Sequence, residues 1–300
     1  MTSLYQRHGG RSPEHPVLVV VLEGWVDAGL GADGAISALL AAEPTELVAT
    51  FDGEALLDQR ARRPVVHIAH GVNEGLTWPL VQMRLGTDLA GNDVCYLVGP
   101  EPDFRWHSFV ADVVELSTAL GVRMAVGLGA FPAPAPHTRP IRLAATAPPQ
   151  SAELVPRVGV VQGEIDVPSG VWGALELAFG EAGVPVVGLW ARVPHYVAGM
   201  AFPAASAALL DGLSALSGLS IDSSELHTSA DAARSQVDEL IAKSSEHSQL
   251  VHQLERNVDV AEGNPLDLGQ IPTGDELAAE LERYLRDDGT DDGGEAGELP

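Results

Sequence analysis

The sequence has few positive charges and few aromatic side chains, and both shortages exclude classes of partner. Its 300 residues include 17 lysines and arginines against 42 aspartates and glutamates, a formal net charge of −25. A surface of this sign repels phosphate backbones and anionic lipid headgroups, and nucleic-acid binding requires a basic face. Aromatic residues make up only 5% of the chain, which leaves few platforms on which bases could stack. We therefore expect neither nucleic acid nor a membrane as a partner.

Cysteine and lysine are almost absent. The single cysteine, Cys95, lies in an apolar run, so an intramolecular disulfide is excluded and a buried core thiol is expected. The single lysine, Lys243, lies in the C-terminal part, which excludes Schiff-base chemistry and a Walker-type phosphate loop in the preceding part. No apolar stretch has the length of a signal peptide or a membrane span. A cytoplasmic location is therefore expected.

Apolar runs that favour strands alternate with segments of helical periodicity. Strands are predicted at residues 17–22, 47–51, 65–69, 78–85, 94–98, 123–128, 141–146, 158–162 and 184–191. Helices are predicted at residues 31–42, 104–120, 170–182 and 204–216. The alternation predicts an α/β domain with a largely parallel or mixed sheet and helices on both faces. The segment at residues 132–136, PAPAP, is expected to be extended and to stay out of the central sheet.

Composition divides the chain into four parts. Residues 1–16 are expected to be a flexible N-terminus and residues 17–220 the α/β core domain. A helical C-terminal region is predicted at 221–287, with a long helix or helical hairpin packing on the core or on another subunit, and a second amphipathic helix near its end. Residues 288–300 are predicted to form a disordered acidic tail.

A glycine motif follows the first strand. Gly29, Gly31 and Gly34 match G-x-G-x-x-G at the start of a helix, and Asp52 ends the next strand, as in a dinucleotide-binding fingerprint. Against this interpretation, residues 23–28 intervene between strand and glycines and place two carboxylates near the pyrophosphate position. The alternative is a glycine-rich strand-to-helix loop that packs closely.

Polar side chains gather in the loops at the predicted strand ends. They are Glu23, Asp27, Glu101, Trp106, His137, Arg139, His195 and Tyr196. In open α/β sheets such loops converge at the carboxyl edge, where ligands bind, so these residues form a candidate ligand- or partner-binding pocket. The structural alternative is that Arg139 pairs with a carboxylate and that each histidine caps a helix or bonds a carbonyl. No catalytic residue and no cofactor is predicted. No metal site is predicted either, because His67 and His70 would point to opposite faces of a strand and could not share a metal ion.

Five segments resemble the proteasome assembly chaperone family, in its actinobacterial branch. They are EGWVDAG at 23–29, GPEPD at 99–103 with Trp106 after it, GLGAFPAPAPHTRP at 127–140, SGVWG at 169–173 and VPHY at 193–196. The resemblance covers most of residues 17–215 and implies a three-layer α/β/α fold similar to phosphorylase/hydrolase-like proteins. Eukaryotic members are non-enzymatic chaperones that assemble proteasome α-rings, usually in pairs.

The resemblance implies a function in assembly rather than catalysis. The leading hypothesis is a non-enzymatic, chaperone-like protein that forms a homo-oligomer, with a trimer as one form, and that has proteasome subunits as a candidate partner. A second hypothesis, by analogy of fold, is a small-molecule hydrolase or phosphorylase with His137 or His195 as general base and Arg139 binding an anionic group. The third is dinucleotide binding through residues 29–34.

Overall fold

A mixed eight-stranded sheet organises the computed structural model, which describes residues 3–24, 26–161 and 163–263. In spatial order its strands are β1 (Tyr5–Arg7), β3 (Glu46–Phe51), β6 (Gln82–Thr87), β7 (Asp93–Pro100), β2 (Val17–Glu23), β8 (Met124–Ala133), β10 (Val186–Pro194) and β9 (Leu143–Thr146). The four strands from β7 to β10 run parallel, and antiparallel strands flank them on both sides. The carboxyl ends of the parallel strands therefore share one edge.

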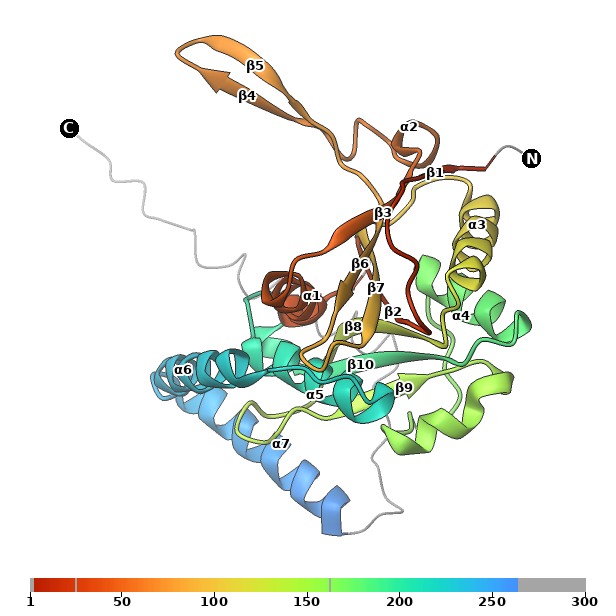
Figure 1. The fold of residues 1–300 in the computed structure, drawn as a ribbon. Helices are drawn as coiled ribbons and strands as arrows, with labels where there is room; N and C mark the ends of the chain where they lie inside the picture. Colours follow the sequence, from red (N-terminus) through yellow and green to blue (C-terminus); the bar gives the residue numbers. More distant parts are fainter. Residues whose placement is uncertain (1–2, 25, 162, 264–300) are drawn as a thin grey trace, which may run out of the picture. The chain divides into compact units, whose positions relative to one another are not determined.

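The central strand β2 is apolar on both faces because helices cover both. Val17 and Val19 belong to one core cluster, whereas Leu18 and Val20 belong to the other. The first cluster packs beneath α1 (Gly31–Ala42) and α5 (Pro203–Ser217), and the second beneath α3 (Trp106–Ala119) and α4 (Val171–Glu181). The result is the predicted three-layer α/β/α arrangement (Figure 1).

Two further helices follow the core. They are α6 (Ser224–Ile241), whose Val237 is buried in the α1/α5 cluster, and α7 (Ser245–Gly263). The first compact unit ends at Glu255, and of the second the structure describes only the last turns of α7. The shorter elements are η1 (Ala28–Leu30), α2 (Gly53–Leu56), η2 (Pro149–Arg157) and η3 (His195–Val197). No helix in the described part is both long and apolar enough to cross a membrane.

A β-hairpin stands apart from the main sheet. Among the described strands, β4 (Val65–Ala69) and β5 (Val72–Thr77) pair only with each other, and they project away from the core (Figure 1). His70 and Gly71 connect them, both with positive φ (51° and 82°), as a two-residue type I′ turn requires. The prediction of a strand at 78–85 was wrong in its placement, because the strand after β4 is β5, which ends at Thr77, and the next strand, β6, begins at Gln82.

Two other local predictions were wrong. β8 continues through Pro132 and Ala133, which pair with β10 although the proline-rich segment was expected to stay out of the sheet. The proline fits because β2 pairs with β8 only as far as Gly127, so no neighbour on that side requires an N–H. The predicted strand at 158–162 has no counterpart among its described residues 158–161, where the Gly159 carbonyl accepts from the Ala145 N–H instead. The helix predicted near the C-terminus and the acidic tail lie outside the described residues.

Candidate functional site

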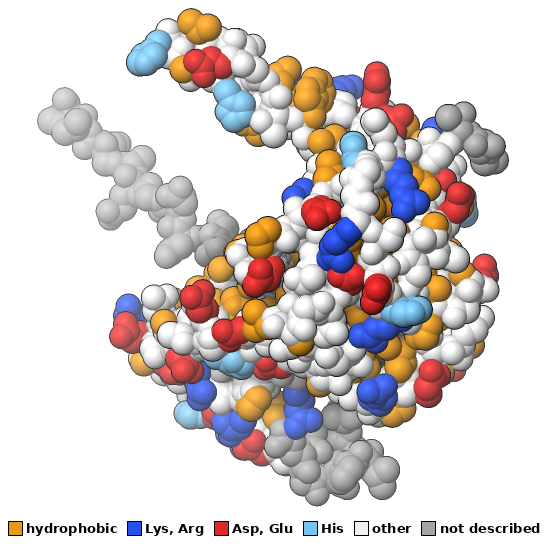
Figure 2. Space-filling view, in the orientation of Figure 1, with side chains coloured by type: hydrophobic (Ala, Val, Ile, Leu, Met, Phe, Trp, Pro, Cys, Tyr) orange, Lys and Arg blue, Asp and Glu red, His pale blue; other side chains and the backbone are white. Residues whose placement is uncertain are grey.

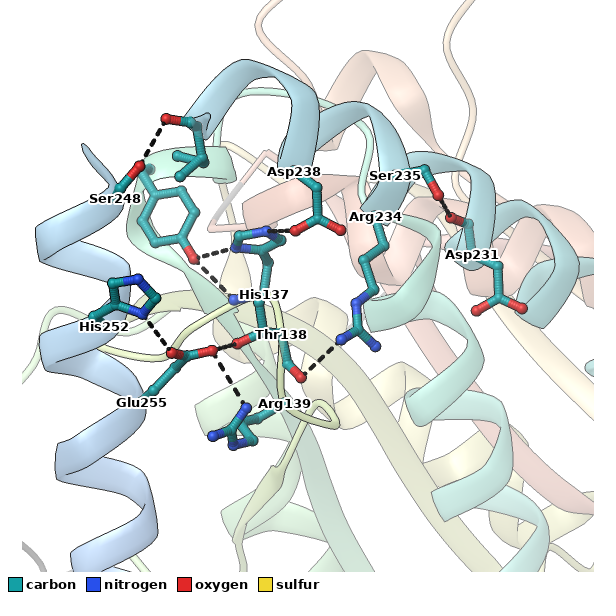
Figure 3. A network of polar contacts seen from close by, with 12 residues as sticks. His137, Thr138, Arg139, Asp231, Arg234, Ser235, Asp238, Ser248, His252 and Glu255 are labelled. Carbon is teal, nitrogen blue, oxygen red and sulfur yellow. Dashed lines mark hydrogen bonds and ion pairs between the residues drawn. The ribbon is translucent and has the colours of Figure 1, made fainter. Parts of the chain in front are cut away.

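His137 links the core to the C-terminal helices. Its side chain is fully buried, and its Nε2 lies 2.9 Å from Oδ1 of Asp238 on α6. On the other side of the ring, Nδ1 lies 2.8 Å from the Tyr196 hydroxyl, which also accepts from the His137 backbone N–H at 2.8 Å (Figure 3). Because a carboxylate only accepts, Nε2 carries a proton toward Asp238. In the neutral ring Nδ1 then accepts from the tyrosine hydroxyl.

The Tyr196 hydroxyl remains protonated in this chain of hydrogen bonds. Burial raises its pKa to about 12, and the nearby Glu255 and Asp238 carboxylates add to the effect, although the hydrogen bond from the His137 backbone opposes it. The His195 ring meets Tyr196 edge to face, with ring centroids 5.3 Å apart. The arrangement holds three of the predicted site residues together but leaves both nitrogens of the buried imidazole occupied.

A second polar cluster surrounds Glu255 on α7. Its Oε1 accepts from Thr138 Oγ1 at 2.5 Å and from Arg139 Nη1 at 3.3 Å, and its Oε2 lies 3.0 Å from His252 Nδ1 (Figure 3). Arg234 of α6 donates to the Thr138 carbonyl at 3.1 Å. The loop between β8 and β9 is thus hydrogen-bonded to both α6 and α7. We call His137, Thr138, Arg139, Tyr196, Arg234, Asp238, His252 and Glu255 the latch.

We expect acid to loosen the Glu255 half of the latch. Hydrogen bonds from Thr138 and then His252 hold the pKa of Glu255 below its ordinary value of 4.5. A lowered folded-state pKa stabilises the fold above the unfolded value, and this contribution is lost as pH falls below 4.5. Hydrogen exchange, corrected for its intrinsic pH dependence, should show protection of α7 falling between about pH 5 and about pH 3.

Two variants isolate this effect. Glu255→Gln should flatten the pH dependence of α7 protection, because the side chain no longer titrates. Glu246→Gln, at an exposed position in the first turn of α7, should leave it unchanged. An equal response of the two variants would show that Glu255 is not the titrating group.

Asp27 is used as a helix cap. Its Oδ1 accepts from the Ala32 N–H at 2.8 Å and its Oδ2 from the Asp33 N–H at 3.0 Å, at the start of α1. Burial raises the pKa of this carboxyl, although the two backbone hydrogen bonds oppose the shift. The carboxylate occupies the N–H groups that a pyrophosphate would need.

The glycines after Asp27 serve helix packing. A Cβ on Gly29 would lie 2.9 Å from Cβ of Phe202, and one on Gly31 would lie 2.9 Å from Cβ of Ala130 and 3.0 Å from that of Ala205. Gly34 faces the Ser206 side chain in the same way. These contacts bring α1 close to α5 and β8, so the structure favours the close-packing interpretation over dinucleotide binding.

The remaining predicted residues lie around the ends of β2 and β7. Glu101 accepts from the Val171 N–H at the start of α4, and its own N–H donates to the Glu23 carbonyl at 2.6 Å. Trp106 donates through Nε1 to the Pro102 carbonyl at 2.6 Å. A cavity of about 50 Å³ at this edge is lined by Glu101 and by none of the other seven predicted residues. Asp27, His137 and Arg139 therefore do not join Glu101 in this cavity, and this arrangement does not favour the enzyme hypothesis.

Four latch residues were missed by the sequence analysis. Arg234, Asp238, His252 and Glu255 lie on α6 and α7, where only a long helix or helical hairpin was predicted. One signal was present: Asp238 follows the buried Val237, and His252 and Glu255 directly follow the buried Val251 and Leu254. A polar residue next to an inward-facing position lies at the margin of the contact and can reach across it.

The fold and the latch define a class of protein: an α/β/α sandwich in which C-terminal helices are tied to the carboxyl edge of the sheet. The model of the PAC2 family matches residues 21–241, and the chain belongs to that family. The resemblance to proteasome assembly chaperones is thereby confirmed. No curated protein matches the sequence.

Three of the similar solved structures come from Corynebacterium glutamicum and Mycobacterium tuberculosis. A Corynebacterium glutamicum protein of unknown function is 30% identical, with a TM-score of 0.80 over 88% of this chain and 99% of its own. A Mycobacterium tuberculosis protein of unknown function is 33% identical, with a TM-score of 0.80 over 88% and 93%. A proteasome-assembly chaperone homologue from Mycobacterium tuberculosis is 32% identical, with a TM-score of 0.72 over 78% and 99%.

Proposed function

We propose that this protein is a non-enzymatic, chaperone-like assembly factor that works as a homo-oligomer, with its subunits joined through the β4–β5 hairpin. The observation that carries the proposal is an apolar arm whose side chains are exposed in the described part of the chain. Five aliphatic side chains of the hairpin are between 42% and 64% exposed, namely Val65, Val66, Ile68, Val72 and Leu76. Figure 2 shows hydrophobic and histidine side chains along the projecting arm.

An isolated two-stranded hairpin is marginal in water unless something packs against it. Here Val66 and Leu76 face each other across the strands, and Ile68 lies two residues further along the same strand. Among the described residues these side chains have no buried core of their own to join. A large exposed apolar surface of this kind marks a protein contact.

Charge favours a second copy as the occupant. Two chains of net charge −25 repel each other over most of their surface, whereas residues 65–77 contain one carboxylate, Glu74, and neither lysine nor arginine. The exposed Arg60 and Arg63 lie just before the hairpin and would complement the acidic surface of another subunit. The hairpin is therefore where two copies can approach at low electrostatic cost.

A proteasome-related partner is proposed from the relatives. One similar structure is that of a proteasome-assembly chaperone homologue, and the family match extends over residues 21–241. The buried imidazole with both nitrogens bonded, and the separation of the predicted site residues, support assembly over the hydrolase, phosphorylase and dinucleotide alternatives. The cytoplasmic location remains a prediction.

Light scattering coupled to size-exclusion chromatography tests self-association. The full chain should form a discrete oligomer, and the double variant Ile68→Asp with Val72→Asp should be monomeric, because two carboxylates would have to be buried in the contact. Leu177→Asp is the matched control, since Leu177 is 57% exposed on α4, outside the hairpin. A monomeric parent chain, or a double variant that stays oligomeric, would refute the hairpin contact.

The partner is tested separately by mixing the full chain with proteasome α-subunits of the same organism. A shared peak of defined stoichiometry would support the assembly function. A stable homo-oligomer that leaves the α-subunits unbound would contradict that partner while leaving the hairpin contact intact.

A further inference from the structure

A small cavity with an aromatic lining lies on the α4 side of the sheet. It opens between the end of β2, the middle of β8 and the start of α4, and has a volume of about 50 Å³, room for roughly four water-sized groups. Leu22 and Val26 contribute apolar wall, and Trp172 and Trp190 contribute indole rings. Among the described residues that line it, Glu101 is the only charged one.

The two indole rings pack directly against glycines of strand β8. A Cβ on Gly127 would lie 2.5 Å from Cδ2 of Trp172, and one on Gly129 would lie 2.5 Å from Cε3 of Trp190. No larger residue would allow the rings to approach the backbone of β8 so closely. The glycines of this strand thus make room for aromatic rings beside the cavity.

Hydrogen bonds of the indole nitrogens fix the ring orientation. Trp172 Nε1 donates to Glu176 Oε2 at 3.0 Å, and Trp190 Nε1 donates to Thr146 Oγ1 at 3.0 Å. Thr146 in turn donates to the same Glu176 oxygen at 2.7 Å. Both indole N–H groups therefore donate to other side chains. A ligand in the cavity would contact the rings but would not receive a hydrogen bond from either N–H group.

The carboxylate in the cavity is buried and held in place. Glu101 is 9% exposed, and one of its oxygens accepts from the Val171 N–H. Arg62 lies close to Gly24 beside Glu101, but its guanidinium is ion-paired with Asp103. A negative charge beside indole rings in a largely apolar cavity is a combination that recognises an organic cation.

The geometry points to a binding site for a small organic ammonium ion, with Glu101 as the counter-charge and Trp172 and Trp190 as the aromatic wall. This site is independent of the hairpin contact, because none of its residues belongs to β4 or β5. Its volume suits an ammonium headgroup with small alkyl substituents. An anionic ligand would meet the Glu101 carboxylate and be repelled.

Tetramethylammonium chloride is the probe, titrated against the full chain with intrinsic tryptophan fluorescence and thermal unfolding as readouts. We expect saturable binding that sodium chloride at equal ionic strength and the neutral isostere tert-butanol do not reproduce. Glu101→Gln keeps an acceptor for the Val171 N–H but removes the charge, and should weaken binding by at least about tenfold. Trp190→Phe should weaken binding less than Glu101→Gln does, because a benzene ring still offers a π face to the cation. Binding should nevertheless be weaker than in the parent chain, because benzene is a poorer cation–π partner than indole.

Trp106→Phe is the matched control, since Trp106 lies outside the cavity lining and bonds the Pro102 carbonyl. It should bind the probe as the parent chain does. A response to tetramethylammonium that sodium chloride or tert-butanol matches would overturn the proposal. So would undiminished affinity in Glu101→Gln, whose folding is checked by its unfolding transition.

Discussion

Replacing His137 by alanine should lower the free energy of unfolding by about 3 kcal/mol, because the substitution empties a fully buried position and leaves the Tyr196 O–H without its acceptor. The side chain is fully buried between the Tyr196 hydroxyl and the Asp238 carboxylate, at 2.8 and 2.9 Å. Its loss removes the hydrogen bond to Asp238 on α6 and leaves a cavity. Urea unfolding measures the total effect, and hydrogen exchange should show α6 losing protection before the sheet does.

The matched control is His227→Ala. His227 and Asp211 form a second imidazole–carboxylate pair with the same 2.9 Å distance, but both side chains are more than half exposed. Exposed pairs contribute about 0 to 1 kcal/mol, so this variant should be nearly neutral. If the two variants cost the same, burial of His137 is not what makes the latch strong.

Gly127→Ala should destabilise the fold by about 2 to 3 kcal/mol, the usual range for overfilling a packed interior. The added methyl group would lie 2.5 Å from Cδ2 and 2.7 Å from Cζ2 of Trp172. The ring cannot turn aside without giving up its hydrogen bond to Glu176. Gly127 is also paired with β2 on one side and β10 on the other, so the backbone cannot move easily either.

Gly199→Ala is the control, because a Cβ there meets nothing within 4 Å. In a Trp172→Ala background, the additional cost of Gly127→Ala should fall to nearly nothing, as a double-mutant cycle of urea unfolding would show. A cost that persists without the indole would assign the effect to strand β8 itself rather than to the ring.

Much of the fold was predictable because its core elements are simple in pattern. The run at 17–22 is apolar at every position, which is typical of a strand covered on both faces, and it forms β2 at the centre of the sheet. The helices α1, α3, α4 and α5 were each predicted close to their observed bounds, since their periodicity and terminal residues are clear. The five segments that resemble the family lie at the ends of such elements and in the adjoining loops, and residues 127–133 of the longest one belong to β8.

The hairpin partner and the proline-containing end of β8 were not predictable in the same way. Whether Val72–Thr77 pairs with β4 depends on a two-residue turn whose His70 must adopt a positive φ. Pro132 is acceptable in β8 only because the neighbouring strand has already ended. Both outcomes depend on which strands lie next to each other, and local pattern carries little information about that.

The sequence by itself determined the fold class, the family and the identity of the polar loop residues, because burial patterns and motifs are local. Tertiary structure alone decided how those residues are used. It turned Asp27 and Glu101 into caps of α1 and α4, and it placed His137 against Asp238, 101 residues away in the chain. It also brought two tryptophans onto the glycines of β8. Such partners are chosen by packing across the sheet, which brings together side chains that no spacing in the sequence relates.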